Sequence, residues 1–209
     1  MDHLQHLIER YPQLEPLKHD INAAFTIIAE SFSNDGKLLI AGNGGSAADS
    51  EHIVGELMKN FGKKRILPDI FVSSIKKVDF ESAQYLVDCL QPCFPAIALS
   101  CHASLNTAII NDIDSDIVFA QQVYGYGNAG DVFLGISTSG NSKNVSYAMI
   151  TAKAKNMKTI ALSGSSGGIL LKHADIAIVV PEKETFKIQE LHLPIYHALC
   201  LMIEEHFFP

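Results

Sequence analysis

The sequence predicts a three-layer α/β/α sandwich with a five-stranded, mainly parallel sheet. Five short apolar runs bounded by turn residues recur along the chain, with stretches of helical periodicity between them. The runs show almost no polar alternation, which is typical of parallel strands covered by helices on both faces. Two long apolar segments near the ends of the chain predict terminal helices. We expect a single domain over residues 1–209 with an N-terminal helical extension.

Each expected strand corresponds to one of these runs. In chain order they are "GKLLIAG" from 36, "FPAIALS" from 94, "DVFLGIS" from 131, "KTIALSG" from 158 and "ADIAIVVP" from 174. After the third run, Val145, Met149 and Ala152 fall on one stripe of an amphipathic helix, which predicts a β-α-β unit.

The remaining helices follow from segment boundaries. Residues 13–33 and 186–207 are expected to form the long terminal helices. Pro68 and Pro92 bracket a long connection, within which residues 79–90 predict one helix.

Composition excludes several classes of protein. A chain of 209 residues with 47% apolar content can build one full core, and its net charge of −7 argues against a nucleic-acid surface. The basic run "KKR" at 63–65 is expected to be a solvated loop. No apolar stretch suits a membrane span, and the polar N-terminus does not suit a secretory signal, so a cytoplasmic protein is expected.

The four cysteines lack CxxC spacing, which indicates neither a disulfide framework nor a thiolate zinc site. We expect Cys89, Cys93, Cys101 and Cys200 to be buried thiols.

Two stretches rich in glycine and serine follow expected strands. "AGNGGSAAD" follows the first strand and "GISTSGNSKNV" the third, so both should lie at the carboxyl edge of the sheet, where ligands bind in open parallel sheets. Each would offer backbone N–H groups and hydroxyls to an anion at the start of a helix. Neither contains the lysine of a Walker A motif, so a single phosphate suits the loops better than a nucleoside triphosphate.

Two further stretches carry titratable side chains at helical spacing. His52 and Glu56 lie four residues apart and therefore share a helix face. The C-terminal stretch "FKIQELHLPIYHAL" places Gln189 and His197 eight residues apart, about 12 Å along a continuous helix. One shared ion would require the helix to start after Gln189, the two side chains to lean together, or two subunits to contribute. His192 is expected to be a packed or surface histidine.

These stretches are similar in content, order and spacing to the SIS (sugar isomerase) domain family, and within it to the phosphoheptose isomerase branch. The resemblance runs from about residue 20 to the C-terminus. It implies an aldose-ketose isomerase acting on a phosphorylated sugar, with sedoheptulose 7-phosphate as the expected substrate.

The resemblance also implies roles for individual residues. The implied phosphate pocket is Ser46, Ser137, Thr138, Ser139 and Ser142, and the implied contacts to the sugar hydroxyls are Asn43, Asn111 and Asp112. Gly44, Gly45 and Gln189 are further expected substrate-binding residues. The implied ligands of one divalent metal ion per subunit, usually zinc, are His52, Glu56, Gln189 and His197, with Glu56 and His197 also transferring protons. We further expect a homotetramer with sites at subunit interfaces, and neither membrane nor nucleic acid as a partner.

Two alternatives use the same glycine and serine loops without catalysis. A related SIS protein is a regulator that associates with the replication initiator and ends in an aromatic-proline tail much like "FFP" here. A phosphosugar sensor would also keep the serine pocket. The presence of His52, Glu56, Gln189 and His197 together favours the enzyme.

Overall fold

The computed structural model describes residues 2–208, which contain one five-stranded sheet. The strands are β1 (Leu38–Ala41), β2 (Ala96–Ala98), β3 (Val132–Ser137), β4 (Lys158–Ser163) and β5 (Ile176–Val179). Their order is β2-β1-β3-β4-β5, and each neighbouring pair is parallel. All five expected strands are confirmed, and the sheet is wholly parallel.

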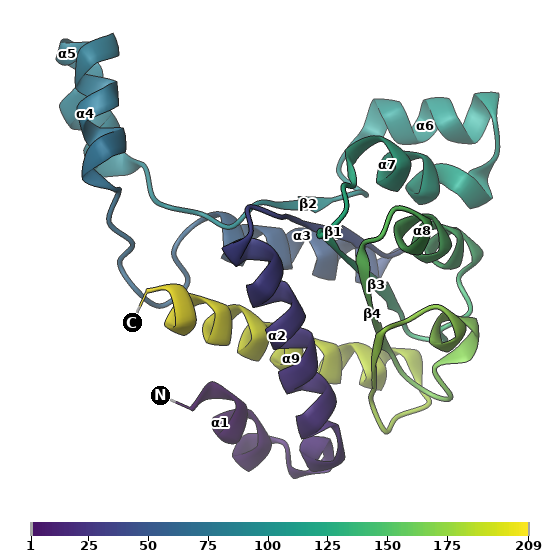
Figure 1. Cartoon of the computed structure of the whole chain (residues 1–209). Helices are drawn as coiled ribbons and strands as arrows, with labels where there is room; N and C mark the ends of the chain where they lie inside the picture. Colours follow the sequence, from purple (N-terminus) through teal and green to yellow (C-terminus); the bar gives the residue numbers. More distant parts are fainter. Residues whose placement is uncertain (1, 209) are drawn as a thin grey trace.

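Helices cover both faces of this sheet (Figure 1). One layer contains α1 (His3–Arg10), α2 (Lys18–Ser33), α3 (Gly45–Met58) and α9 (Thr185–Phe207), and the other contains α6 (Ala103–Asp112), α7 (Val118–Tyr126) and α8 (Lys143–Ala154). Successive residues of a strand point to opposite faces, so Leu38 and Ile40 enter the first core while Leu39 and Ala41 enter the second. The predicted three-layer sandwich is confirmed.

The strand order places a topological switch between β1 and β3. The chain leaves β1 toward the edge strand β2 and then returns to build β3 on the other side of β1. Crossovers that diverge in this way leave a crevice outside the carboxyl ends of the two strands. The two glycine and serine loops follow these two strands.

The terminal helices agree with the prediction apart from their beginnings. The segment 13–33 starts with a 3₁₀ turn, Pro12–Leu17, before α2, because Pro16 lacks the N–H that a regular α-helix would use there. The additional helix α1 packs against α9. Its N-cap Asp2 accepts a hydrogen bond from the backbone N–H of Gln5 (2.9 Å). The C-terminal helix extends from 185 to 207, as expected.

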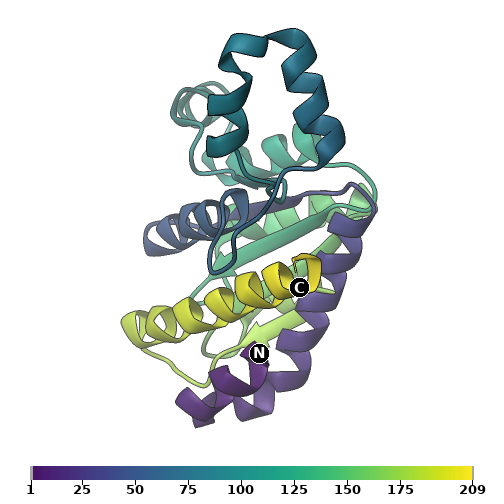
Figure 2. The ribbon, with the colours of Figure 1, turned by 90° about the vertical axis from the view of Figure 1, so that its left-hand side faces the viewer.

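The connection at 62–93 contains a helical hairpin that projects from the sandwich (Figures 1 and 2). The expected helix at 79–90 is α5 (Phe80–Cys89), and Asp79 caps it. A second helix, α4 (Asp69–Val78), precedes it and was not predicted. Its start has the signals of Pro68 and an acidic first turn, and its apolar residues recur at helical spacing although none of them is buried. The sequence therefore contained a local signal for α4 that the prediction did not use.

A buried ion pair anchors the base of this hairpin. The side chains of Arg65 and Glu204 are 1% and 2% exposed, and Arg65 Nε lies 3.0 Å from Glu204 Oε1. The Arg65 guanidinium also donates to the backbone carbonyls of Leu57 and Pro92. The expectation of a solvated loop at 63–65 is therefore wrong for Arg65, since its carboxylate partner lies 139 residues away along the chain.

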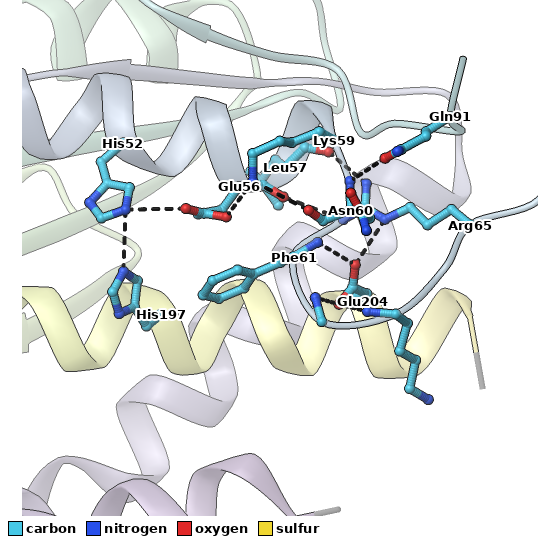
Figure 3. A network of polar contacts seen from close by, with 12 residues as sticks. His52, Glu56, Leu57, Lys59, Asn60, Phe61, Arg65, Gln91, His197 and Glu204 are labelled. Carbon is cyan, nitrogen blue, oxygen red and sulfur yellow. Dashed lines mark hydrogen bonds and ion pairs between the residues drawn. The ribbon is translucent and has the colours of Figure 1, made fainter. Parts of the chain in front are cut away.

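The carboxylate of Glu204 collects further donors from the loop. The backbone N–H groups of Phe61, Gly62 and Lys63 donate to it at 2.6–3.0 Å (Figure 3). Burial acts to raise the pKa of Glu204, but these N–H groups and Arg65 outweigh it and hold the pKa below its ordinary value. The start of the hairpin is thus fixed to the end of α9.

Two other expectations concern single features. Cys200 is buried, as predicted, whereas Cys89, Cys93 and Cys101 are exposed because they lie on the hairpin or in loops. Each helix within residues 2–208 is too short or too polar to cross a lipid bilayer.

Replacing Glu204 should strongly destabilise the protein. Glu204→Gln leaves the Arg65 charge buried without its counter-charge, which costs about 3–5 kcal/mol of unfolding free energy. Urea denaturation followed by circular dichroism measures this loss. The control Lys187→Met removes only the exposed pair with Glu184 and should change stability by less than about 0.5 kcal/mol. Equal stability of Glu204→Gln and Lys187→Met would show that the Arg65–Glu204 ion pair contributes little to the free energy of unfolding.

Candidate active site

Two loops meet at the carboxyl ends of β1 and β3. The side-chain amides of Asn43 and Asn144 exchange two hydrogen bonds, 2.9 and 3.0 Å long, across 101 residues of sequence. Asn144 Oδ1 also accepts from the backbone N–H of Val145 in the first turn of α8. The reciprocal pair fixes one loop against the other, so both face the same crevice.

The first loop leads directly into the start of α3. Gly44 is the N-cap with φ of +57°, and no side chain caps this helix end. The N–H groups of Ser46 and Ala47 donate to the backbone carbonyls of Asn43 and Gly44, and the positive end of the helix dipole faces the loop. A Cβ on Gly45 would lie 2.3 Å from Nε2 of Gln189, so the amide of Gln189 on α9 lies directly against the loop.

The second loop presents hydroxyls in a fixed arrangement. Ser137 Oγ and Ser142 Oγ are 2.9 Å apart, and Ser139 Oγ accepts from the backbone N–H of Asn141. Gly140 has φ of +66°, and a Cβ there would lie 1.9 Å from the carbonyl oxygen of Gly167. The loop 164–168 therefore packs directly against it. Hydroxyls at the positive ends of two helices around one crevice are features of a phosphate site.

A row of titratable groups lies farther along α3 and α9. Nε2 of His52 is 3.2 Å from Oε1 of Glu56 and 3.5 Å from Nε2 of His197 (Figure 3). The i, i+4 spacing of His52 and Glu56 on α3 places both on the face toward α9, as predicted. These three side chains come together although His197 is 145 residues from His52.

Hydrogen bonds on the far side of His52 hold its ring in place. The hydroxyl of Tyr196 donates to Oδ1 of Asp49 (3.3 Å), and its oxygen lies 3.0 Å from Nδ1 of His52. Nδ1 is therefore placed to donate to the Tyr196 oxygen. Burial and the nearby Asp49 carboxylate raise the pKa of Tyr196, so its hydroxyl remains a donor. The other ring nitrogen of His52, Nε2, faces Glu56 and His197.

Burial also sets the protonation of His197. Desolvation and the neighbouring His52 lower the pKa of His197, and the Glu56 carboxylate only partly opposes them. His197 is therefore a neutral imidazole at neutral pH. The Glu56 side chain is 12% exposed, and its other oxygen, Oε2, accepts from Nζ of Lys59 at 3.0 Å. His197 is thus a neutral base in the same row as the Glu56 carboxylate, which is largely buried from solvent.

The donor types in this row fit a divalent metal ion. Glu56 Oε1 and His197 Nε2 lie 3.2 and 3.5 Å from Nε2 of His52, and these imidazole nitrogens and this carboxylate oxygen are atom types that bind divalent ions such as zinc. The Tyr196–Asp49 hydrogen bonds behind His52 are of the kind that orients a metal-ligating imidazole. In the described residues the three groups form a row, and no three histidine, cysteine or acidic side chains surround a common centre.

The structure separates Gln189 from this row. Helix α9 is continuous from Thr185, so the possibility that it begins after Gln189 is wrong. The Gln189 amide lies against Gly45, at the phosphate loop. In a single chain it is therefore placed to contact the substrate, and its assignment as a metal ligand stays a prediction.

The other predicted residues lie in two settings. Asn111 and Asp112 are exposed at the end of α6, where the Asn111 amide donates to the Asp112 carboxylate (2.8 Å), and their contact with a sugar stays a prediction. His192 is fully buried, and burial lowers its pKa to about 4, so it is the packed, neutral histidine that we expected.

Four residues of the site were not predicted. They are Asp49, Lys59, Asn144 and Tyr196. Lys59 had a local signal, because it lies three residues after Glu56 on the same helix. The others act through partners that are 101 or more residues away, which local spacing does not show.

Comparison with known proteins is consistent with this geometry. The SIS domain family matches residues 2–87 and 80–164. Phosphoheptose isomerase of Sulfurimonas denitrificans is 41% identical over 93% of this chain and 86% of its own length. Phosphoheptose isomerase of Helicobacter pylori is 39% identical over 93% of this chain and 88% of its own.

Solved structures agree. Phosphoheptose isomerase from Neisseria gonorrhoeae superposes with a TM-score of 0.76 at 33% identity, covering 97% of this chain and 95% of its own. The phosphoheptose isomerase from Francisella tularensis superposes with a TM-score of 0.77 at 32% identity, covering 94% and 91% of the two chains.

Loss of a loop hydroxyl should weaken phosphate binding. Ser142→Ala removes a hydroxyl donor aimed at the crevice, and a hydrogen bond to a charged group contributes about 1.5–3 kcal/mol, so affinity for a phosphosugar should fall at least about tenfold. Isothermal titration calorimetry measures the affinity. Ser104→Ala, on exposed α6, is the matched control and should bind as the wild type does. Unchanged binding by both Ser142→Ala and Ser46→Ala would remove the phosphate from these loops.

Proposed function

Because the chain belongs to the SIS domain family and its relatives are phosphoheptose isomerases, we propose that it converts sedoheptulose 7-phosphate to D-glycero-D-manno-heptose 7-phosphate. The observation that carries the proposal is the convergence of His52, Glu56 and His197 beside the two-loop crevice. An aldose-ketose isomerase needs both a phosphate anchor and a pair of proton-transfer groups, and the chain has both.

The two ends of the site are separated by two turns of α9. Gln189 lies at the phosphate loops and His197 in the titratable row, about 12 Å apart along the helix. A phosphorylated sugar that extends along α9 can touch both ends at once. The loops then hold the phosphate while the carbonyl end lies at the row, which supplies the positioning that isomerisation requires.

Proton transfer falls to Glu56 and His197. One removes a proton from C1 of the ketose while O2 gains a proton, and the other, protonated by exchange with solvent, delivers a proton to C2 of the enediol while O1 loses its proton. The low exposure of the Glu56 carboxylate and the neutral state of His197 suit either group to accept the first proton. Lys59 keeps the carboxylate oriented through Oε2, and the Tyr196–Asp49 hydrogen bonds fix the plane of His52.

A divalent metal ion, with zinc as the first candidate, completes this proposal at one ion per subunit. His52, Glu56 and His197 would hold it, with Gln189 as the fourth ligand that the family resemblance implies. When bound, such an ion polarises the substrate carbonyl as a Lewis acid. The mixed nitrogen and oxygen donors suit zinc and also admit nickel, iron or manganese.

We also propose a cytoplasmic homotetramer with sites at subunit interfaces. An interface at the site would allow a partner's Gln189 to approach the row of His52, Glu56 and His197. Light scattering should give the mass of four 22.8 kDa chains. A mass of one chain at micromolar concentration would contradict the tetramer.

Turnover in deuterated water tests the reaction. The protein should convert sedoheptulose 7-phosphate to the heptose phosphate with deuterium at C2, detected by NMR. Glu56→Gln and His197→Ala each remove a proton-transfer group, so kcat should fall by about 10² to 10⁴-fold. Glu51→Gln, an exposed carboxylate on the same helix, is the control and should retain activity.

The same assay distinguishes the alternatives. Full turnover by Glu56→Gln and His197→Ala would refute their roles. Phosphosugar binding without turnover of any ketose phosphate would identify a regulator or sensor instead of an enzyme.

Metal content is a separate prediction. Protein purified without chelator should contain about one equivalent of a divalent metal by elemental analysis, and chelation should abolish turnover until metal is restored. His52→Ala should lose the metal, whereas His206→Ala, outside the row, should keep it. Full activity with less than a tenth of an equivalent would show that the row works by acid-base chemistry alone.

A further inference from the structure

The helical hairpin of α4 and α5 has almost no core of its own. No residue of α4 and only Ala83 of α5 is buried, and the two helices rise clear of the sandwich (Figure 2). Two ten-residue helices are too short to be stable in water without tertiary packing. We therefore expect the hairpin to be covered by another surface in the assembled protein.

The space between its helices forms two hollows. The hollow at the base, about 410 Å³, is lined by apolar side chains and by two basic and two acidic ones. They are Ile66, Leu67, Val72, Val87, Leu90, Lys64, Arg65, Asp69 and Asp88, together with Gln91. The hollow at the tip, about 500 Å³, is lined by Lys76, Phe80, Glu81, Ala83 and Gln84. The tip also offers a large apolar side chain, since Phe80 is 78% exposed.

Helical phase places both hollows on one face of the hairpin. Asp69 at the base and Lys76 at the tip are seven residues apart on α4, which leaves them within about 20° around the helix. Phe80 at the tip and Val87 at the base have the same spacing on α5. One face of the hairpin thus has the exposed Phe80 side chain at its tip and, at its base, a groove of mixed apolar and charged side chains in which Asp69 and Asp88 lie.

We propose that this face is a homophilic interface, in which the hairpins of two copies pair antiparallel about a two-fold axis. Phe80 of each copy enters the base groove of the other. Lys76 of each copy then lies beside Asp69 and Asp88 of the other, and Glu81 lies beside Lys64. A parallel pairing would place like charges together at both ends.

A second copy fits this face better than an unrelated partner because the face is complementary to itself. Isologous contacts require residue i to meet j while j meets i, and the Phe80 side chain and the groove satisfy this in both directions. Ile66 is 77% exposed and Leu90 is 44% exposed, so both would be covered along with Phe80. With side chains of this size, the pair buries on the order of 1,000 Å², the lower limit for a specific interface.

Mutation of the full chain with sedimentation velocity tests the pairing. Phe80→Glu should weaken association at least about tenfold, so that its complex contains half as many copies as that of the wild type. Val78→Glu is the matched control. Val78 is 88% exposed on the same hairpin but lines neither hollow, so its variant should associate as the wild type does.

Charge reversal makes the test independent of folding. Lys76→Glu alone, and Asp69→Lys with Asp88→Lys, should each weaken association by placing like charges together. All three substitutions in one chain should restore it, because every reversed charge meets a reversed partner. Failure of the triple variant to recover, or association lost in Val78→Glu and kept in Phe80→Glu, would overturn the proposal.

Discussion

The structure of the site depends on the divergence of the chain at β1 and β3. Because β2 and β3 flank β1 on opposite sides, the loops after β1 and β3 open into one crevice. The reciprocal amide pair of Asn43 and Asn144 holds those loops together, and each loop continues into a helix whose N-terminus faces the crevice. A phosphate can therefore be held by hydroxyls at the positive ends of these two helices.

The second determinant is the continuity of α9. This helix carries Gln189 at the first glycine loop and His197 in the titratable row. Its last turns carry Glu204, the carboxylate that pairs with Arg65. One continuous helix therefore sets the distance between the two parts of the site that would bind the two ends of the proposed substrate. It also fixes the beginning of the hairpin, because Arg65 and the loop 61–63 are bound to its last turns.

Much of this arrangement could be predicted from the sequence, for identifiable reasons. The strands were visible because residues buried on both faces must be apolar, and the His52–Glu56 pair because helical spacing is local. Residues that act through distant partners could not be predicted from local sequence. Asn144 is paired with Asn43, and Arg65 lies in a basic run but is paired with the distant Glu204. Helix α4 had a local signal in the helical spacing of its apolar residues, but Pro68 was interpreted only as the boundary of a connection.

The central claim is that one extended phosphosugar spans the loops and the titratable row. Its most direct test is kcat/KM for ketose phosphates of five, six and seven carbons, together with unphosphorylated sedoheptulose. The account predicts the highest value for the seven-carbon phosphate, a decrease with each shorter chain, and a loss of at least about tenfold without the phosphate. Equal values for the three chain lengths, or full activity without the phosphate, would contradict it.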